Sequence, residues 1–472
     1  MSSEKSLENS ALMVATLTSF MGPFTISSVN VALPTIQAEF SADAVVLSWV
    51  ATSYLLTIAV FLVPFGKVAD IYGRKKIFTL GLFLYTSASL LAIFSFSMKI
   101  LIAMRILQGI GAAMFVTTGM AIITSIFPPA RRGKAIGIYV SAVYIGLSVG
   151  PFAGGFITRY LGWRSIFAVV VPFGAASVLM TLRYLKGEWA DARGETLDIR
   201  GSVLYGLSIL ILVYGASLLP RTAAVYLVIA GLAGLVLFIR LELRIPHPVF
   251  EVKLFSRNRL FTFSSLAALI NYSATFALTF LLSLYLQYIK GVPPQYTGSI
   301  LIAQPIMMAI FSPLAGRLSD RVEPRLLASA GMSITVMGLV FLAFIGPQTS
   351  QAMIVLILAV MGFGFALFSS PNMNAIMGAV DKRYLSIASG AVATMRLLGQ
   401  MFSMAIAMVV FAIFIGREQI TPANHEEFLK SVRVSFLIFS LMCSVGILFS
   451  LMRGELRHKS SHDSGGPARK SR

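Results

Sequence analysis

Long apolar runs recur along almost the whole chain, and each is about as long as a helix that crosses a lipid bilayer. A spanning helix needs about 20 mostly apolar residues. Soluble domains have about 25% charged residues, whereas this chain has 12% charged and 57% hydrophobic residues. No run alternates in the manner of a barrel strand. Because lipid cannot satisfy backbone polar groups, the sequence predicts an all-α integral membrane bundle.

Fourteen spans are predicted, and an even number places both termini on the same side of the membrane. Most of the 38 Lys and Arg residues fall in the loops and the tail of that side, and the positive-inside rule makes it cytoplasmic. The first run is longer than a cleavable signal, so we expect it to be retained. The predicted spans are 11–31, 46–66, 77–97, 100–125, 134–158, 163–185, 199–219, 222–242, 260–288, 297–316, 326–346, 352–378, 386–416 and 432–452.

Several other classes of protein are excluded by composition. The net charge of +19 is spread over short loops and does not form one basic face, so no nucleic-acid partner is expected. A single cysteine, Cys443, excludes an internal disulfide and a thiolate metal cluster. No Walker loop is present to bind ATP. We expect no cofactor, no metal site and no enzymatic activity, because the four histidines fall in loops or the tail: His247, His425, His458 and His462.

Two similar loops divide the chain into repeated halves. GKVADIYGRKK (66–76) follows the second span and GRLSDRVEPR (316–325) follows the tenth. Each loop therefore lies between the second and third helices of a six-helix unit, and internal repeats of this kind are typical of secondary transporters. The predicted domains are an N-terminal bundle at 1–188, a linker with two inserted helices at 189–259, a C-terminal bundle at 260–453 and a basic cytoplasmic tail at 454–472.

Three motifs carry a resemblance to a known family. The loop at 66–76 resembles the GxLADRxGRKx motif of the major facilitator superfamily, and the run 105–113 resembles the helix 4 motif of that superfamily. The run 146–155 resembles its helix 5 antiporter motif, GxxxGPxxGG. With fourteen spans and SVNVALP in the first of them, the chain is similar to the fourteen-helix drug:proton antiporter branch. The substrate is a separate question, because a fold does not fix function.

The resemblance implies gates at the two repeated loops and a hinge in the fifth span. Asp70 is expected to meet the helix start near Ser386, and Asp320 could act in the same way near Gly133; the alternative is an ordinary cytoplasmic turn. In the fifth span, close helix packing is the alternative to a hinge. The candidate gate residues are Gly66, Asp70, Gly73, Arg74, Gly316 and Asp320, and the candidate hinge residues are Gly146, Gly150, Pro151, Gly154 and Gly155.

Polar residues at membrane depth are candidates for a substrate cavity. Arg105 is expected to face this cavity, with Gln108 on the same helix face; the alternative is that Arg105 reaches to the outer surface. Arg396 and Gln400 form a second pair of this kind. The other candidates, each of which could instead bridge helices, are Thr25, Asn30, Asn271, Gln304 and Asn372.

The first span lacks the carboxylate that proton coupling would use. In the antiporter branch the pattern of this helix resembles LDxTIVNVALP, and alignment on Asn30 and Pro34 places Thr25 where that Asp belongs. We expect no carboxylate within any span, and therefore either weak coupling to protons or the use of a carboxylate supplied by the substrate or by a loop. The expected function is export of amphiphilic small molecules from the plasma membrane by a monomer in contact with lipid. The alternative is a carrier or exchanger of an anionic organic solute.

Overall fold

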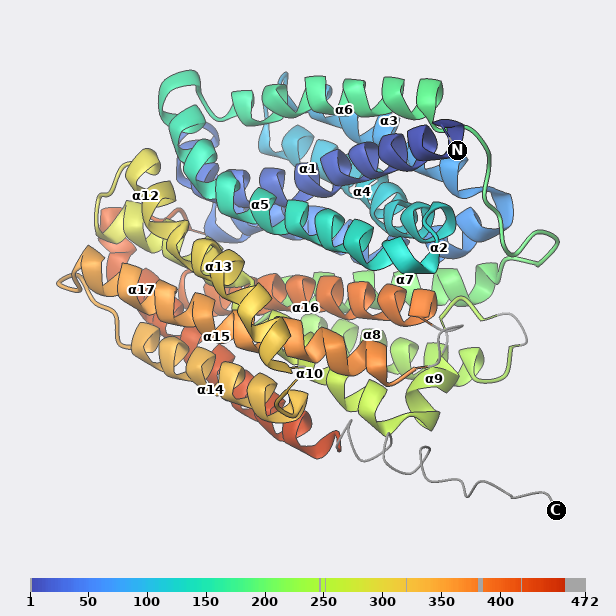
Figure 1. The fold of residues 1–472 in the computed structure, drawn as a ribbon. Helices are drawn as coiled ribbons and strands as arrows, with labels where there is room; N and C mark the ends of the chain where they lie inside the picture. Colours follow the sequence, from blue (N-terminus) through green and yellow to red (C-terminus); the bar gives the residue numbers. More distant parts are fainter. Residues whose placement is uncertain are drawn as a thin grey trace, which may run out of the picture.

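The computed structural model describes residues 2–245, 248–250, 252–319, 321–380, 385–416 and 418–454. These residues form long helices that run side by side, and no strand occurs in the described ranges (Figure 1). The basic tail expected at 454–472 lies outside the described residues, apart from Gly454. An all-α architecture is therefore confirmed for the part of the chain that the structure describes.

The first half of the chain forms a six-helix bundle in which α1 packs along α5 and against α6, while α4 packs between α2 and α3. Figure 1 shows α1 and α5 lying next to each other along most of their length. The helices are α1 (Ser2–Phe40), α2 (Ala44–Tyr72), α3 (Arg74–Ala92), α4 (Met98–Ile126), α5 (Pro129–Leu161) and α6 (Arg164–Tyr184).

The last part of the chain forms a second bundle whose first two predicted spans are broken. At the first break the backbone N–H of Ala277 donates to the hydroxyl of Ser403 on α16 at 2.9 Å, so a side chain of a neighbouring helix satisfies a group that the break exposes. The elements are α9 (Val252–Arg257), α10 (Arg259–Thr275), α11 (Ala277–Leu284), the π-helix η1 (Tyr285–Ile289), α12 (Pro294–Leu301), α13 (Ala303–Ser319), α14 (Pro324–Ala343), α15 (Gln351–Gly378), α16 (Leu385–Phe414), the short 3₁₀ turn η3 (Pro422–Asn424) and α17 (His425–Met452).

Two further helices, α7 (Ile199–Ser217) and α8 (Thr222–Glu242), are inserted between the bundles. They pack against each other, and α7 also contacts α2 of the first half and α16 of the second. The Tyr205 hydroxyl donates to the Ala59 carbonyl at 2.9 Å and fixes α7 on α2.

Thirteen helical stretches of the described chain are long and apolar enough to cross a membrane. The predicted span at 77–97 corresponds to α3, which is not among the thirteen. This helix starts with three basic residues, Arg74 to Lys76, and it packs along α4. The structure thus supports a multi-pass bundle, and the count of fourteen stays a prediction.

The bundle has two ends, which we name by the chain termini. The terminal side is the end where α1 begins and α17 finishes, and it also carries the α2–α3 turn and the linker at 185–198. The Arg259 guanidinium at the start of α10 donates to the Met452 carbonyl at 3.2 Å, which places these two helix ends together. The opposite side carries the α1–α2 turn and the segment before α17.

Candidate substrate cavity

A cavity of about 90 Å³ lies between the two halves, and we call it the interface cavity. α1 and α5 contribute its lining from the first half, and α10, α11, α12, α13, α15 and α16 contribute from the second. Three of the predicted cavity residues line it: Asn30, Gln304 and Gln400. The Asn30 side-chain oxygen is buried and accepts no hydrogen bond from the described residues. This oxygen is therefore ready to accept a hydrogen bond from a bound molecule.

The opposite side of the interface cavity is closed by contacts between the halves. The Ser283 hydroxyl donates to the Asn30 carbonyl at 2.9 Å, and the Gln287 amide donates to the Val31 carbonyl at 2.9 Å. Farther out, the backbone N–H of Ala44 donates to the Glu418 carbonyl at 2.9 Å. These bonds join α1 and the start of α2 to the second half. These described contacts therefore hold the halves together between the cavity and the opposite side.

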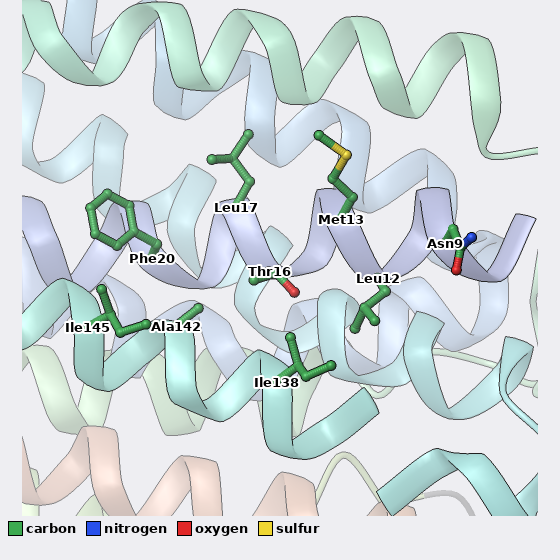
Figure 2. A pocket seen from close by; sticks show the side chains of 9 residues that line it. All are labelled: Asn9, Leu12, Met13, Thr16, Leu17, Phe20, Ile138, Ala142 and Ile145. Carbon is green, nitrogen blue, oxygen red and sulfur yellow. The ribbon is translucent and has the colours of Figure 1, made fainter. Parts of the chain in front are cut away.

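The interface cavity is too small for a drug-sized ligand in this state, because such ligands occupy about 300–1,000 Å³. A larger hollow of about 600 Å³ lies between α1 and α5 near the terminal side (Figure 2). It is lined only by residues of the first half, mostly apolar ones such as Leu12, Phe20 and Ile145. We take the interface cavity as the candidate site, because, of these two cavities, it is the one that residues of both halves line with polar groups.

Arg105 does not lie at the substrate cavity, where the sequence predicted it. It is completely buried inside the first half, and it does not line the interface cavity. Its guanidinium donates to the Val50 carbonyl at 3.0 Å and to the Gln108 side-chain oxygen at 2.9 Å, and it stacks 4.2 Å above the Tyr54 ring. The Gln108 amide in turn donates to Ser89 at 2.7 Å. Polar groups of α2, α3 and α4 thus satisfy this cation within one bundle.

Thr25 also points into the first half and away from the interface cavity. Its hydroxyl lies 2.8 Å from the Tyr85 hydroxyl and donates to the Met21 carbonyl at 2.8 Å. The Tyr85 hydroxyl lies within electrostatic range of the Arg105 guanidinium. We call these buried residues the Arg105 cluster: Thr25, Tyr54, Tyr85, Ser89, Arg105 and Gln108.

Two predicted cavity residues hold helices of the second half together instead. Asn271 is fully buried, with its amide 3.9 Å from the Cys443 sulfur on α17. The side-chain oxygen of Asn372 accepts from the Arg453 guanidinium at 2.8 Å, while its amide donates to the Ser264 carbonyl at 3.1 Å. Burial lowers the pKa of Arg453 to about 10, so this residue stays charged at neutral pH. Both asparagines therefore bridge helices, which was the alternative to contact with solute.

Arg396 lies at the boundary between the halves, one turn before the cavity residue Gln400. It lies within electrostatic range of the hydroxyls of Tyr139 on α5 and Tyr272 on α10. The side chain is half-buried, and within the described parts of the chain it forms no ion pair. Tyr272 also lines the interface cavity. Arg396 is consequently a cation beside the cavity, without a described carboxylate partner.

The glycines of α5 bring helices into close contact. A Cβ added to Gly150 would lie 2.2 Å from the Ser27 hydroxyl oxygen, and one on Gly154 would lie 2.6 Å from the Ser28 Cα. Gly155 faces the other half, where its Cβ would lie 2.3 Å from the Pro294 carbonyl oxygen. Gly146 packs on α1 in the same way, and Pro151 lies inside the helix. This geometry shows close packing on both faces of α5, and a hinge stays a proposal.

The close contact between α1 and α5 explains some of the polar residues of α1. The Ser28 hydroxyl donates to the Gly150 carbonyl at 2.8 Å, and the Ser27 hydroxyl donates to the Pro23 carbonyl within its own helix. Among the polar residues of α1, Ser27 and Asn30 line the interface cavity. α1 therefore uses its polar residues both for the cavity and for packing on α5.

The first loop motif is held by the linker between the halves. Arg74 forms ion pairs with Asp70 at 2.7 Å and with Asp191 of the linker at 2.8 Å. Gly73 takes a φ of +118°, which a residue with a side chain rarely adopts, and it separates α2 from α3. Gly66 lies against Thr117 of α4, and Gly316 lies against Ser370 of α15. Asp320 and the side chain of Ser386 lie outside the described residues, and only the backbone of Gly133 is described, so the gate contacts expected there stay predictions.

Glu242 is an acidic residue that the sequence analysis overlooked. It is the last residue of the predicted span at 222–242 and is 1% exposed at the end of α8. The expectation that no carboxylate lies within any span is therefore wrong. Glu242 ends a strongly apolar run and lies next to basic residues, so in the sequence it resembles a charged residue of a loop.

Comparisons with known proteins agree with this architecture. The sequence model of the Major Facilitator Superfamily matches residues 15–404 and 264–471. The chain is 29% identical over 443 residues to the riboflavin transporter RibZ of Clostridioides difficile, covering 93% of this chain and 96% of that protein. It is 32% identical over 394 residues to the multidrug resistance protein Stp of Mycobacterium tuberculosis, covering 82% of this chain and 73% of that protein.

A solved structure supports the fold. A bacterial homolog of the human lysosomal transporter Spinster, in an inward-facing and unoccupied conformation, matches with a TM-score of 0.67 at 17% identity, covering 95% of this chain and 97% of that one. The family match extends over most of the chain, and the two-bundle arrangement agrees with it. This chain belongs to the Major Facilitator Superfamily of membrane transporters, and it is not an enzyme.

Proposed function

We propose that this protein exports amphiphilic small molecules across the plasma membrane by alternating access, as a fourteen-span monomer with cytoplasmic termini. The observation that carries the proposal is the interface cavity, which both halves line and which inter-half bonds close on the opposite side. A site between two repeats becomes accessible to each side in turn when the repeats rock against each other. The resistance protein among the relatives supports an amphiphilic solute.

The test is transport by the purified protein in liposomes. Counterflow of a labelled cationic or neutral drug should exceed the background of empty liposomes. Gln304→Ala and Gln400→Ala should lower this flux several-fold, because both side chains line the interface cavity. Exposed Gln351 on α15 offers a matched control, Gln351→Ala, which should leave flux unchanged. Equal flux in all three variants would remove the interface cavity as the substrate site.

The alternative function, transport of an anionic organic solute, is favoured by Arg396. A guanidinium beside the interface cavity that pairs with no carboxylate among the described residues attracts a carboxylate or phosphate and can bind it with two parallel hydrogen bonds. Counterflow of an organic anion that Arg396→Gln abolishes, with drug flux unaffected, would select this function. If Arg396→Gln lowers the flux of the drug but not that of the organic anion, export of amphiphiles remains the proposed function.

Membrane orientation is tested separately. A reporter fused after Arg200 should report cytoplasm, and one placed between residues 418 and 424 should report exterior. The opposite result at either position would contradict the fourteen-span topology with cytoplasmic termini. This test does not depend on the identity of the solute.

A further inference from the structure

Two carboxylates, the buried Glu242 and the partly buried Asp198, meet where the inserted helices come together on the terminal side. Asp198 caps the start of α7, and one of its oxygens accepts from the Gly201 backbone N–H at 3.0 Å. Glu242 ends α8, and one of its oxygens accepts from the Phe250 backbone N–H at 2.8 Å. The second oxygen of each carboxylate is buried and has no hydrogen-bond donor among the described residues. Each group is therefore only half satisfied.

The two unsatisfied oxygens point to the same place. The Asp198 oxygen lies 2.1 Å, and the Glu242 oxygen 2.7 Å, from the point where a Cβ on Gly201 would stand. Glycine at this position leaves the space into which both carboxylates project. Two ionised carboxylates cannot hydrogen-bond to each other, because both are acceptors only. One proton between them would supply the missing donor to both oxygens.

No described cation offsets these two negative charges. Asp198 is the charged group that acts on Glu242. Arg200 on α7, Arg240 on α8 and Arg244 just after α8 are exposed. On the neighbouring α2, Lys67 pairs with Glu195 at 2.5 Å. His247 lies outside the described residues. Like charges buried side by side are strongly unfavourable, and a carboxylate pair relieves this by retaining one proton.

We propose that Asp198 and Glu242 share one proton and form a proton-binding site at the terminal side of the inserted helices. This site is separate from the interface cavity, since none of the residues that line the cavity belongs to α7 or α8. It stands independently of the proposed export function, because proton binding can be measured without transport. Proton loss at higher pH leaves two facing anions and separates the start of α7 from the end of α8.

The dependence of stability on pH has a definite sign. In the unfolded chain both carboxyl groups are ionised at neutral pH, whereas the folded pair retains a proton. The folded state therefore binds more protons, and the free energy of unfolding falls as the pH rises until the pair is ionised. Glu242→Gln replaces the shared proton by an amide that donates to Asp198 at every pH. Its stability should be independent of pH over this interval and should exceed that of the wild type at high pH.

The direct test is infrared difference spectroscopy of the full chain in liposomes during a pH titration. The wild type should show a protonated carboxylic acid band that disappears as the pH rises, and Glu242→Gln and Asp198→Asn should each abolish it. Exposed Glu427→Gln, and His247→Gln, should leave the band unchanged. Thermal unfolding of Glu242→Gln should show the loss of pH dependence. A band that persists in both carboxylate variants, a band lost in His247→Gln, or an unchanged pH dependence in Glu242→Gln would overturn the proposal.

Discussion

At the scale of single residues, several buried polar side chains that were predicted to line the substrate cavity contact helices within one bundle instead. Arg105 and Asn372 each find their partners on neighbouring helices of their own half, as polar residues of membrane helices commonly do. The spacing of Arg105 and Gln108 correctly predicted that they share a helix face. It could not predict which neighbour that face meets, because this depends on how α4 is rotated against α2 and α3.

The first prediction concerns Arg105. Each hydrogen bond from a charged donor contributes about 1.5–3 kcal/mol, and Arg105→Ala removes two such bonds and the stacking on Tyr54. We expect a lower temperature of thermal unfolding in detergent and reduced yield of folded protein. Arg105→Lys should recover little stability, because an ammonium lacks the planar fork of the guanidinium. Exposed Arg159→Ala is the control, and equal unfolding temperatures for both Ala variants would contradict the structural role of Arg105.

The second prediction concerns Thr25. Because the Thr25 hydroxyl meets Tyr85 in the Arg105 cluster, a carboxylate here would lie near a buried cation and could gain and lose a proton. Thr25→Asp should make transport of a neutral or cationic drug more dependent on an imposed pH gradient than it is in the wild type. Thr25→Asn has nearly the same shape without the charge and serves as the control. The same gradient dependence in both variants would show that this position does not decide coupling.

At the scale of helices, the apolar runs predicted where most helices lie but not where they break. The predicted span at 260–288 is divided into α10, α11 and η1, and the predicted span at 297–316 is divided into α12 and α13. The first break depends on a hydrogen bond from Ala277 to Ser403, which is 126 residues away and invisible to a local pattern. The glycine spacing in α5 was interpreted as a hinge, and close helix contact was the alternative; the structure shows the contact, because small residues four positions apart share one face.

The third prediction compares two glycines of α5. Gly154→Ala places a methyl group 2.6 Å from the Ser28 Cα, and this backbone can move only if α1 separates from α5. Overpacking of this kind costs about 1–3 kcal/mol. Gly137→Ala, on the same helix, meets nothing within 4 Å, and it should be neutral or stabilising because Ala favours helix by about 1 kcal/mol. Thermal unfolding of both variants checks this, and equal effects would mean that α1 and α5 do not pack as described.

At the scale of the whole molecule, the repeated loop motif and the fourteen apolar runs predicted two halves with an insert, and this division into domains stays a prediction. The closure of one side could not be predicted. It depends on pairs such as Ser283 with Asn30, which become neighbours only when the two halves dock. The way the halves dock also decides which of the nine predicted cavity residues line the interface cavity. These are Asn30, Gln304 and Gln400.

The last prediction tests whether the halves must separate on the opposite side during transport. The Ala44 N–H and the Glu418 carbonyl oxygen are 2.9 Å apart and belong to different halves. A disulfide between Ala44→Cys and Glu418→Cys should form readily, since Cys443 is buried and does not compete. Under oxidising conditions this double variant should lose most of its flux, because the opposite side can no longer open, and a reductant should restore it.

The matched control for this crosslink joins two helices of the same half. The hydroxyls of Ser329 on α14 and Ser450 on α17 are 2.9 Å apart, so Ser329→Cys with Ser450→Cys can also form a disulfide. This bond lies within one rigid unit and should leave flux largely intact in oxidant. Full transport by the Ala44–Glu418 crosslinked protein would contradict alternating access at this interface. Equal loss of flux in both crosslinked proteins would instead mean that the halves do not move as rigid bodies, since a bond within one half would then also block the transport cycle.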